Sequence, residues 1–141
     1  AASALLSRKS YLDLPAELID RALSGRLIIS ARGEERDVGT LVEFHKGAAG
    51  FPWRSQAKWI GRQMAQRTGG DVVAAGTRAG EVFRSDIYRS VMGPAGADLP
   101  GASEKVEGLL HHPTAVASAS GRVILQRDAF LDGRVFDPYA V

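Results

Sequence analysis

The stretch from Phe44 to Met64, FHKGAAGFPWRSQAKWIGRQM, constrains the fold of this chain more than any other. Pro52 pushes Phe51 out of the helical region of backbone space, so an extended aromatic junction precedes Trp53. Ser55 then has the side chain of a helix N-cap, because its hydroxyl can accept a hydrogen bond from a free backbone N–H. We expect a helix to begin here.

The residues after this junction have helical periodicity. Ala57, Ile60 and Met64 recur on one face, which predicts an amphipathic helix from Ser55 to about Gln66. The pair Gly69-Gly70 then ends it. This helix is the firmest element that the sequence predicts.

A cationic stripe formed by Arg54, Lys58 and Arg62 lies on another face of the same helix. The free N–H groups and dipole at a helix start also favour anions, so the stripe has the chemistry to hold an oxyanion or line a cleft. The alternative is a solvated face that pairs with carboxylates elsewhere, since like charges at this spacing cost only roughly 0.2–0.5 kcal/mol each.

The rest of the chain predicts short elements joined by irregular connections, without a domain boundary between residues 1 and 141. The sequence favours an α/β class, locally α+β, rich in helix, with short strands and long ordered loops. In the first third of the chain we expect a helix over 1–8, a capped helix over 17–23, a strand over 27–29, a charged loop or hairpin tip over 31–39, and a weak strand or helix start over 41–45. The stretch after Gly70 predicts either a buried strand over 71–76 or a helix leading to Arg84, and then a helix from an N-cap at Ser85 through Met92. The last part predicts a meandering loop over 94–121 that wraps a partner surface, followed by a strand over 123–125.

Composition excludes several classes of protein. Hydrophobic residues make up 45% and charged residues 24%, which is ordinary globular composition. The net charge of +2 creates no global field that would steer the chain to nucleic acid or to a membrane. There is no cysteine, and no run approaches the roughly 20 apolar residues that span a bilayer.

Metal and catalytic patterns are missing from the sequence. His111 and His112 are adjacent, so their side chains point in different directions, and His45 is distant in sequence. No nucleophile elbow, thiol or apolar carboxylate pair is recognisable. We therefore predict neither a metal site, a cofactor nor an enzyme.

Several motifs occur in an order that resembles one protein family. The segment Phe44–Ser55 is followed by Gln56 and Trp59, and the chain also contains Leu5–Pro15, Asp86–Arg89, Lys105–Gly108 and Phe130–Pro138. Together these segments resemble the nitrate- and bicarbonate-binding proteins of ABC transporters, a branch of the type II periplasmic binding proteins. Gln56 stands where that family often has His.

The resemblance implies a two-lobed fold in which a ligand closes a hinge. It implies that this chain is the C-terminal part of a solute-binding protein for a small oxyanion, with nitrate first and nitrite or bicarbonate next. If the protein is periplasmic, its partner would be a membrane permease. If it is a cytoplasmic sensor, its partner would be a regulatory protein. The calcium that bicarbonate-binding members use has no ligand set here, and most pocket residues are expected upstream of Ala1.

At the border of that cleft we place Trp53, Arg54, Ser55 and Lys58. Large aromatic residues beside proline are more often packing anchors, so Trp53 and Trp59 also have a structural interpretation. The turn from Gly47 to Gly50 has the residues for an anion-binding nest, although a tight turn before the helix explains it as well.

Two other functions remain open. The cationic stripe, with Arg67, would suit an autonomous module whose basic helix binds nucleic acid or an acidic protein, although the modest net charge argues against nucleic acid. A sulfonate or other organic anion is a further ligand class, because related type II proteins bind them.

The start of the chain reads as the second half of a helix, Ala1–Leu6, which predicts a piece of a longer protein. Apolar faces such as Leu18/Ile19/Leu23 and Ile60/Met64 would then lack a partner. We expect the isolated chain to self-associate through these faces, with a homodimer as the simplest assembly.

Overall fold

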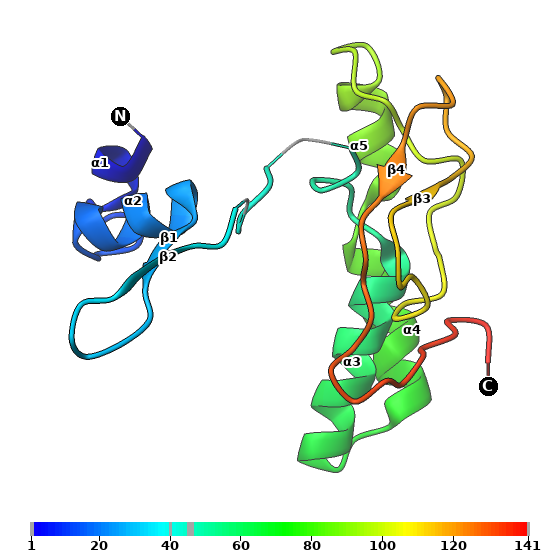
Figure 1. Ribbon diagram of the computed structural model, residues 1–141. Helices are drawn as coiled ribbons and strands as arrows, with labels where there is room; N and C mark the ends of the chain where they lie inside the picture. Colours follow the sequence, from blue (N-terminus) through cyan, green and yellow to red (C-terminus); the bar gives the residue numbers. More distant parts are fainter. Residues whose placement is uncertain (1, 40, 45–46, 141) are drawn as a thin grey trace. The chain divides into compact units, whose positions relative to one another are not determined.

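The computed structural model describes residues 2–39, 41–44 and 47–140 (Figure 1). The chain divides into two compact units, Ala1–Phe44 and His45–Val141. No shift in composition marks this division, which is why the sequence alone predicts no boundary there. Helices and short strands occur in both units, in agreement with the mixed α and β class.

The first unit contains two helices and a β-hairpin. Helix α1 covers Ala2–Leu6 and α2 covers Ala16–Ser24, while strand β1 (Arg26–Ile28) pairs antiparallel with β2 (Glu35–Asp37). The predicted helix over 17–23 is confirmed, and the predicted strand over 27–29 begins one residue earlier. The charged stretch over 31–39 supplies both the hairpin tip and β2.

Gly25 makes the sharp change from α2 to β1. Its φ of 73° is left-handed, and its N–H donates to the carbonyl of Arg21. A Cβ at this position would lie 1.8 Å from the carbonyl oxygen of Gly39, so only glycine fits. Residues 41–44 form neither helix nor strand, and His45 lies outside the described residues.

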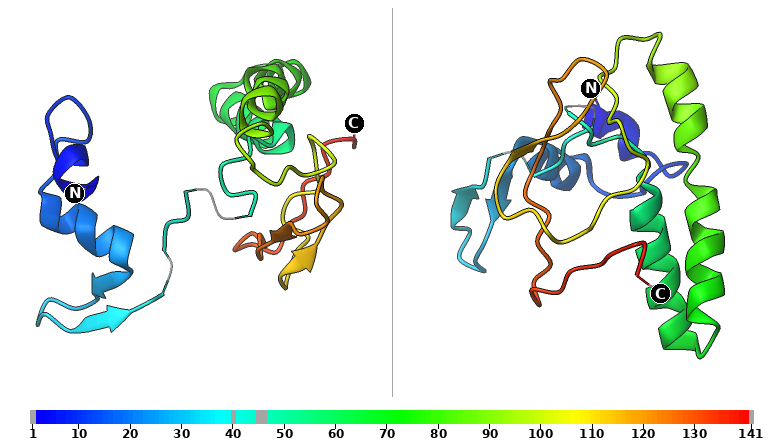
Figure 2. Two further views of the ribbon diagram at one scale, coloured as in Figure 1. Left: turned by 90° about the horizontal axis from the view of Figure 1, so that it is seen from above. Right: turned by 90° about the vertical axis from the view of Figure 1, so that its right-hand side faces the viewer.

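In the second unit, α3 (Arg54–Thr68) and α4 (Val72–Val82) form a helical hairpin (Figures 1 and 2). Gly69, with a φ of 74°, ends α3, as the sequence predicts. The side chain of Asp71 accepts a hydrogen bond from the N–H of Ala74 at 3.0 Å and caps α4. The alternative of a buried strand over 71–76 is therefore wrong, because this cap and the packing against α3 favour a helix.

The start and the buried face of α3 differ from the prediction. Trp53 occupies the N-cap position, and Ser55 lies inside the first turn. The buried residues include Ala57, Gly61 and Ala65, whereas Ile60 is 44% and Met64 63% exposed. The physical reason is the close approach of α4, which admits only small side chains: a Cβ on Gly61 would lie 2.6 Å from that of Ala79.

Helix α5 (Ser85–Met92) is followed by a long irregular region. Arg84, not Ser85, is its N-cap, so Ser85 is the first helical residue. Within the region, β3 (Thr114–Ala115) pairs antiparallel with β4 (Ile124–Leu125), and isolated bridges join Pro100 to Ser118 and Glu107 to Phe136. The predicted meandering loop over 94–121 is therefore anchored within this unit by strand pairing.

The core of the second unit forms around the aromatic junction. Phe51, Trp53, Val123 and Leu125 are buried together. The rings of Phe51 and Trp53 meet edge to face with centroids 4.9 Å apart, and Tyr88 packs on Phe51 in the same manner at 5.6 Å. The junction thus joins α3 and α5 to the β4 segment.

Among the residues that the structure describes, no helix is long and apolar enough to cross a membrane.

Candidate functional site at the start of helix α3

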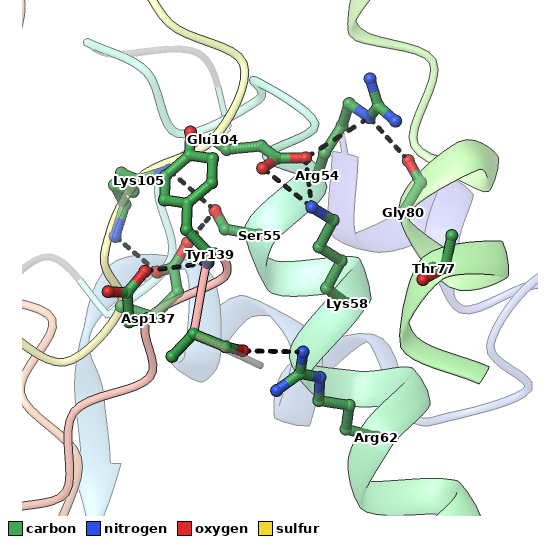
Figure 3. Close-up of polar contacts among 12 residues, drawn as sticks. Arg54, Ser55, Lys58, Arg62, Thr77, Gly80, Glu104, Lys105, Asp137 and Tyr139 are labelled. Carbon is green, nitrogen blue, oxygen red and sulfur yellow. Dashed lines mark hydrogen bonds and ion pairs between the residues drawn. The ribbon is translucent and has the colours of Figure 1, made fainter. Parts of the chain in front are cut away.

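The first turns of α3 present Arg54, Ser55 and Lys58 to the segment around Glu104 and Lys105 (Figure 3). These residues lie about fifty positions apart in the sequence. The N–H of Arg54 donates to the carbonyl of Ser103 at 3.0 Å, so backbone pairing holds the segment against the helix.

Ser55 belongs to a buried polar network. Its side chain is fully buried, and its Oγ donates to Oε1 of Glu107 at 2.6 Å while accepting from the N–H of Lys105 at 3.2 Å. Glu107 is only 4% exposed and receives a second hydrogen bond, of 2.5 Å, from Nζ of Lys105. Lys105 also pairs with Asp128. Every charge in this network has a partner, as burial demands.

Lys58 is held by Glu104, whose side chain is 11% exposed. Nζ of Lys58 lies 2.8 Å from Oε1 and 2.9 Å from Oε2 of Glu104. The lysine stem fills the space over Gly80, where a Cβ would lie 3.0 Å from Cγ of Lys58. From the sequence, one alternative for the cationic stripe was pairing with carboxylates elsewhere. The Lys58–Glu104 ion pair is such a pairing, and it lies within this chain.

Arg62, the third cation of the stripe, contacts the end of the chain. One Nη donates to the carbonyl of Ala140 at 3.2 Å, and the guanidinium lies 5.3 Å from the ring centroid of Phe136. Its Nε is buried without a hydrogen-bond partner among the described residues.

Arg54 lines a pocket next to helix α5, whereas Arg62 lines a smaller one beside Phe130 and Phe136. Nε of Arg54 donates to the carbonyl of Gly80 at 3.0 Å and lies 3.8 Å from Oε1 of Glu104. The Arg54 side chain is 41% exposed. The pocket next to α5 has a volume of about 520 Å³ and is lined by Arg54, Glu81, Phe83, Arg84, Ser85, Asp86, Arg89 and Ser103.

Trp53 does not lie on an open cleft wall of this unit, because its ring is buried in the core. Packing of the tightly joined Phe51-Pro52-Trp53 junction leaves no face of the indole for a planar ligand. The turn over 47–50 closes with a hydrogen bond from the N–H of Phe51 to the carbonyl of Ala48 at 3.1 Å, which fits the interpretation as a tight turn.

The structure therefore separates the four residues that we placed at a cleft border. Trp53, Ser55 and Lys58 are engaged with partners inside the unit, and Arg54 lines a pocket. The sequence did not identify Glu104, Ser85, Ser103 or Arg89 as neighbours of Arg54. Contacts between residues that lie tens of positions apart leave no local periodicity in the sequence. The Lys105–Gly108 motif was the one available sign of the partner segment.

An ion pair sets the electrostatics at one side of the pocket. Arg84 donates from Nε and Nη2 to the two carboxylate oxygens of Asp86, at 2.8 and 2.6 Å. This pairing holds the pKa of Asp86 well below its ordinary value and raises the pKa of Arg84. Both side chains are open to solvent.

No group of three His, Cys, Asp or Glu side chains within residues 2–39, 41–44 and 47–140 is arranged to hold a metal ion. His111 and His112 are exposed, and His45 lies outside the described part of the chain.

Comparison of the chain with protein-family models, curated proteins and solved structures gives no match.

Proposed function

We propose that this chain is part of the substrate-binding component of an ABC transporter for a small oxyanion, with nitrate as the first ligand and nitrite or bicarbonate next. The ordered motifs that resemble the nitrate- and bicarbonate-binding proteins are the basis of this proposal. In that setting the chain is the C-terminal segment of a two-lobed protein, and it binds without catalysing a reaction.

One observation supports the proposal above all: the resemblance motifs that lie in the second unit contact one another, whereas Leu5–Pro15 belongs to the first unit. The hydroxyl of Ser55 bonds to Glu107, and Glu107 exchanges two backbone hydrogen bonds of 2.9 Å with Phe136. Segments 51–55, 105–108 and 130–138 are thereby connected. Residues that are scattered in the sequence are thus the ones that depend on each other in the structure.

The fourth motif and the second tryptophan join the same assembly of segments. The guanidinium of Arg89 lies 4.9 Å from the ring centroid of Phe51 and donates to the carbonyls of Pro100 and Ala102 at 2.5 and 2.7 Å. Trp59 stacks on Phe130 with centroids 5.1 Å apart. A set of motifs that together define a folding unit is what a family signature requires.

In this role the second unit supports a lobe of the binding protein and borders its cleft. Half a cleft lacks the convergent donors that offset the desolvation of an anion, so recognition of nitrate rests mainly on residues outside this chain. Closure of the lobes would present the anion to a permease in the periplasm. In a cytoplasmic sensor, the same closure would hold or release a regulatory protein.

No contact among the described residues favours the alternative of a basic helix that binds nucleic acid or an acidic protein. The three cations of the stripe are engaged by the carbonyl of Gly80, the carboxylate of Glu104 and the carbonyl of Ala140. Binding to DNA that falls steeply with salt would favour this alternative.

Calorimetric titration of nitrate into the full-length gene product that contains this chain tests the proposal. We expect saturable binding that nitrite or bicarbonate competes away and that taurine does not. The absence of heat with all three inorganic anions would overturn the proposal, whereas competition by taurine alone would replace nitrate with a sulfonate.

The 141-residue chain alone is the matched sample. We expect no saturable nitrate binding to it at low salt, because the pocket is expected upstream. Saturable binding to the chain alone would place a complete nitrate site here and direct attention to Arg54.

A further inference from the structure

An apolar groove with a volume of about 500 Å³ runs along the α3–α4 hairpin. It is lined by Gly61, Met64, Ala65, Thr68, Gly70, Asp71, Ala74, Ala75 and Arg78. On each helix the lining residues recur three or four positions apart, so each helix contributes one continuous stripe. Met64 is 63% exposed in this groove. The groove thus combines apolar surface with one charge of each sign, from Asp71 and Arg78.

The two charges of the groove do not neutralise each other within one copy of the chain. Asp71 and Arg78 are two helical turns apart, which is about 10 Å along the axis of α4. Both are exposed, and the ion pairs formed among the described residues include neither of them. Asp71 caps α4 through Oδ1, so Oδ2 remains for another partner. A partner that fits this groove must therefore bring a cation to Asp71 and an anion to Arg78.

The spacing of these charges is self-complementary about a two-fold axis. Two copies of α4 can lie antiparallel with Ala74 of one opposite Ala75 of the other. Asp71 of each copy then comes opposite Arg78 of the other, so two ion pairs form at once, as a two-fold interface requires. Small side chains at the crossing let the two helix axes approach to about 8 Å. The charges therefore select a second copy of this chain as the occupant of the groove.

Met64 lies at the level of this crossing. Across the hairpin, a Cβ on Gly61 would lie 2.7 Å from the carbonyl oxygen of Ala75 and 2.6 Å from Cβ of Ala79. Because α3 and α4 run antiparallel (Figure 1), three residues forward along α3 correspond to three residues back along α4, close to Ala74. A second α4 in the groove would cover the exposed side chain of Met64, whose flexibility suits it to fill such a gap.

We propose that the α3–α4 groove is the interface of a symmetric homodimer in which α4 of each copy lies antiparallel to α4 of its partner. Asp71 of each copy pairs with Arg78 of the other, and Met64 packs on the small residues at the crossing. The sequence predicted self-association through Ile60 and Met64, but it indicated neither the surface that receives them nor the register. This interface goes beyond the proposed oxyanion transport and does not rest on it.

Sedimentation velocity of the full 141-residue chain over a range of protein concentrations tests the interface. We expect a monomer–dimer equilibrium. Arg78→Glu should weaken dimerisation by at least about tenfold, because two attractive pairs become two repulsive ones. Arg127→Glu is the matched control, since it makes the same charge change at an exposed arginine outside the groove and should leave the equilibrium unchanged. A chain that is monomeric at every concentration would overturn the proposal, as would a dimer that Arg78→Glu does not weaken.

Disulfide trapping tests the register independently of the charge variant. The chain contains no cysteine, so a single introduced thiol is a specific probe. Ala75→Cys places two thiols beside the two-fold axis, where their Cα atoms come within reach of a disulfide, and we expect a covalent dimer after mild oxidation. Thr77→Cys is the control, because this exposed position lies on the other side of α4 and should give no covalent dimer. Equal cross-linking of the two variants, or none by Ala75→Cys, would contradict the interface. Neither result bears on nitrate binding by the full-length protein, so the two proposals fail separately.

Discussion

Both units of this chain contain helices and paired strands, but they differ in how many large apolar side chains they bury. The second unit buries Phe51, Trp53, Val123 and Leu125 in one core. In the first unit, Ile19 is the one large apolar side chain among the described residues that is buried. Its exposed large apolar side chains are Leu5, Tyr11, Leu12, Leu14, Leu18, Ile28, Ile29, Val38, Leu41, Val42 and Phe44.

This difference teaches that caps and turns are not sufficient for a stable unit. The first unit has a glycine cap, a paired hairpin and an Arg21–Glu17 ion pair at 2.9 Å. A chain of about 40 residues nevertheless rarely buries enough apolar surface to fold alone. We therefore expect the second unit to carry the cooperative stability of the chain.

The largest expected difference between the two units comes from truncating one buried side chain in each. Trp53→Ala should lower the free energy of unfolding of the second unit by about 3–5 kcal/mol, because it leaves a cavity in the core. Ile19→Ala should leave the main transition unchanged, because it affects only the first unit. Urea unfolding followed by circular dichroism measures both, and equal effects would show that the two units share one transition.

Removal of one carboxylate in each unit gives the next largest difference. Glu107→Gln should cost about 3 kcal/mol, because the buried Ser55 and the half-buried Lys105 lose a charged partner. The matched variant Glu17→Gln breaks an exposed pair with Arg21 and should cost under about 1 kcal/mol. Thermal unfolding compares them, and a neutral Glu107→Gln would contradict the role of this network.

Close packing of α3 on α4 can be tested with two glycines. Gly61→Ala should cost about 1–3 kcal/mol, because the added methyl would lie 2.7 Å from the carbonyl oxygen of Ala75. Gly70→Ala should be nearly neutral, since its methyl meets Ala65 at an ordinary 3.7 Å. Chemical unfolding of both variants measures the contrast, which disappears if the helices are loosely packed.

The smallest expected effect concerns the exposed Arg84–Asp86 pair. Pairing lowers the pKa of Asp86 in the folded state, so its stabilising contribution is present above the ordinary carboxyl pKa and is lost as pH falls through the folded pKa. Arg84→Gln should return the pKa toward its ordinary value. Side-chain ¹³C NMR titration would show this, and an unchanged pKa would contradict the pairing.

Local features of the fold were predictable from the sequence, whereas long-range partners were not. Glycine caps at Gly25 and Gly69 and the helix from position 55 onward follow from local rules, and the structure has them. The N-cap at Ser55 was wrong, because Glu107, fifty-two positions away, captures that hydroxyl. The buried face of α3 was also misplaced, since small residues were selected by contact with α4.

The candidate site shows the same limit. The sequence identified Arg54 but not the hydroxyls and arginines that share its pocket, because these come from α5 and from the segment near position 103. Of the apolar faces that we expected to lack a partner, Leu18, Ile60 and Met64 are exposed, Leu23 is half-buried and Ile19 is buried. Self-association through these faces stays a prediction. Sedimentation velocity checks it, and a well-behaved monomer would count against it.

We claim that the resemblance motifs of the second unit, from Phe51–Ser55 to Phe130–Pro138, form one cooperative unit, and native-state hydrogen exchange tests this most directly. The amides of Arg54, Glu107 and Phe136 donate between those motifs or to their partner segment, at 2.9–3.0 Å. We predict that the three exchange with one common, high free energy of opening, while Ile29 and Val38 of the first unit exchange much faster. Separate opening energies for the three amides, or protection no greater than that of the first unit, would contradict the account.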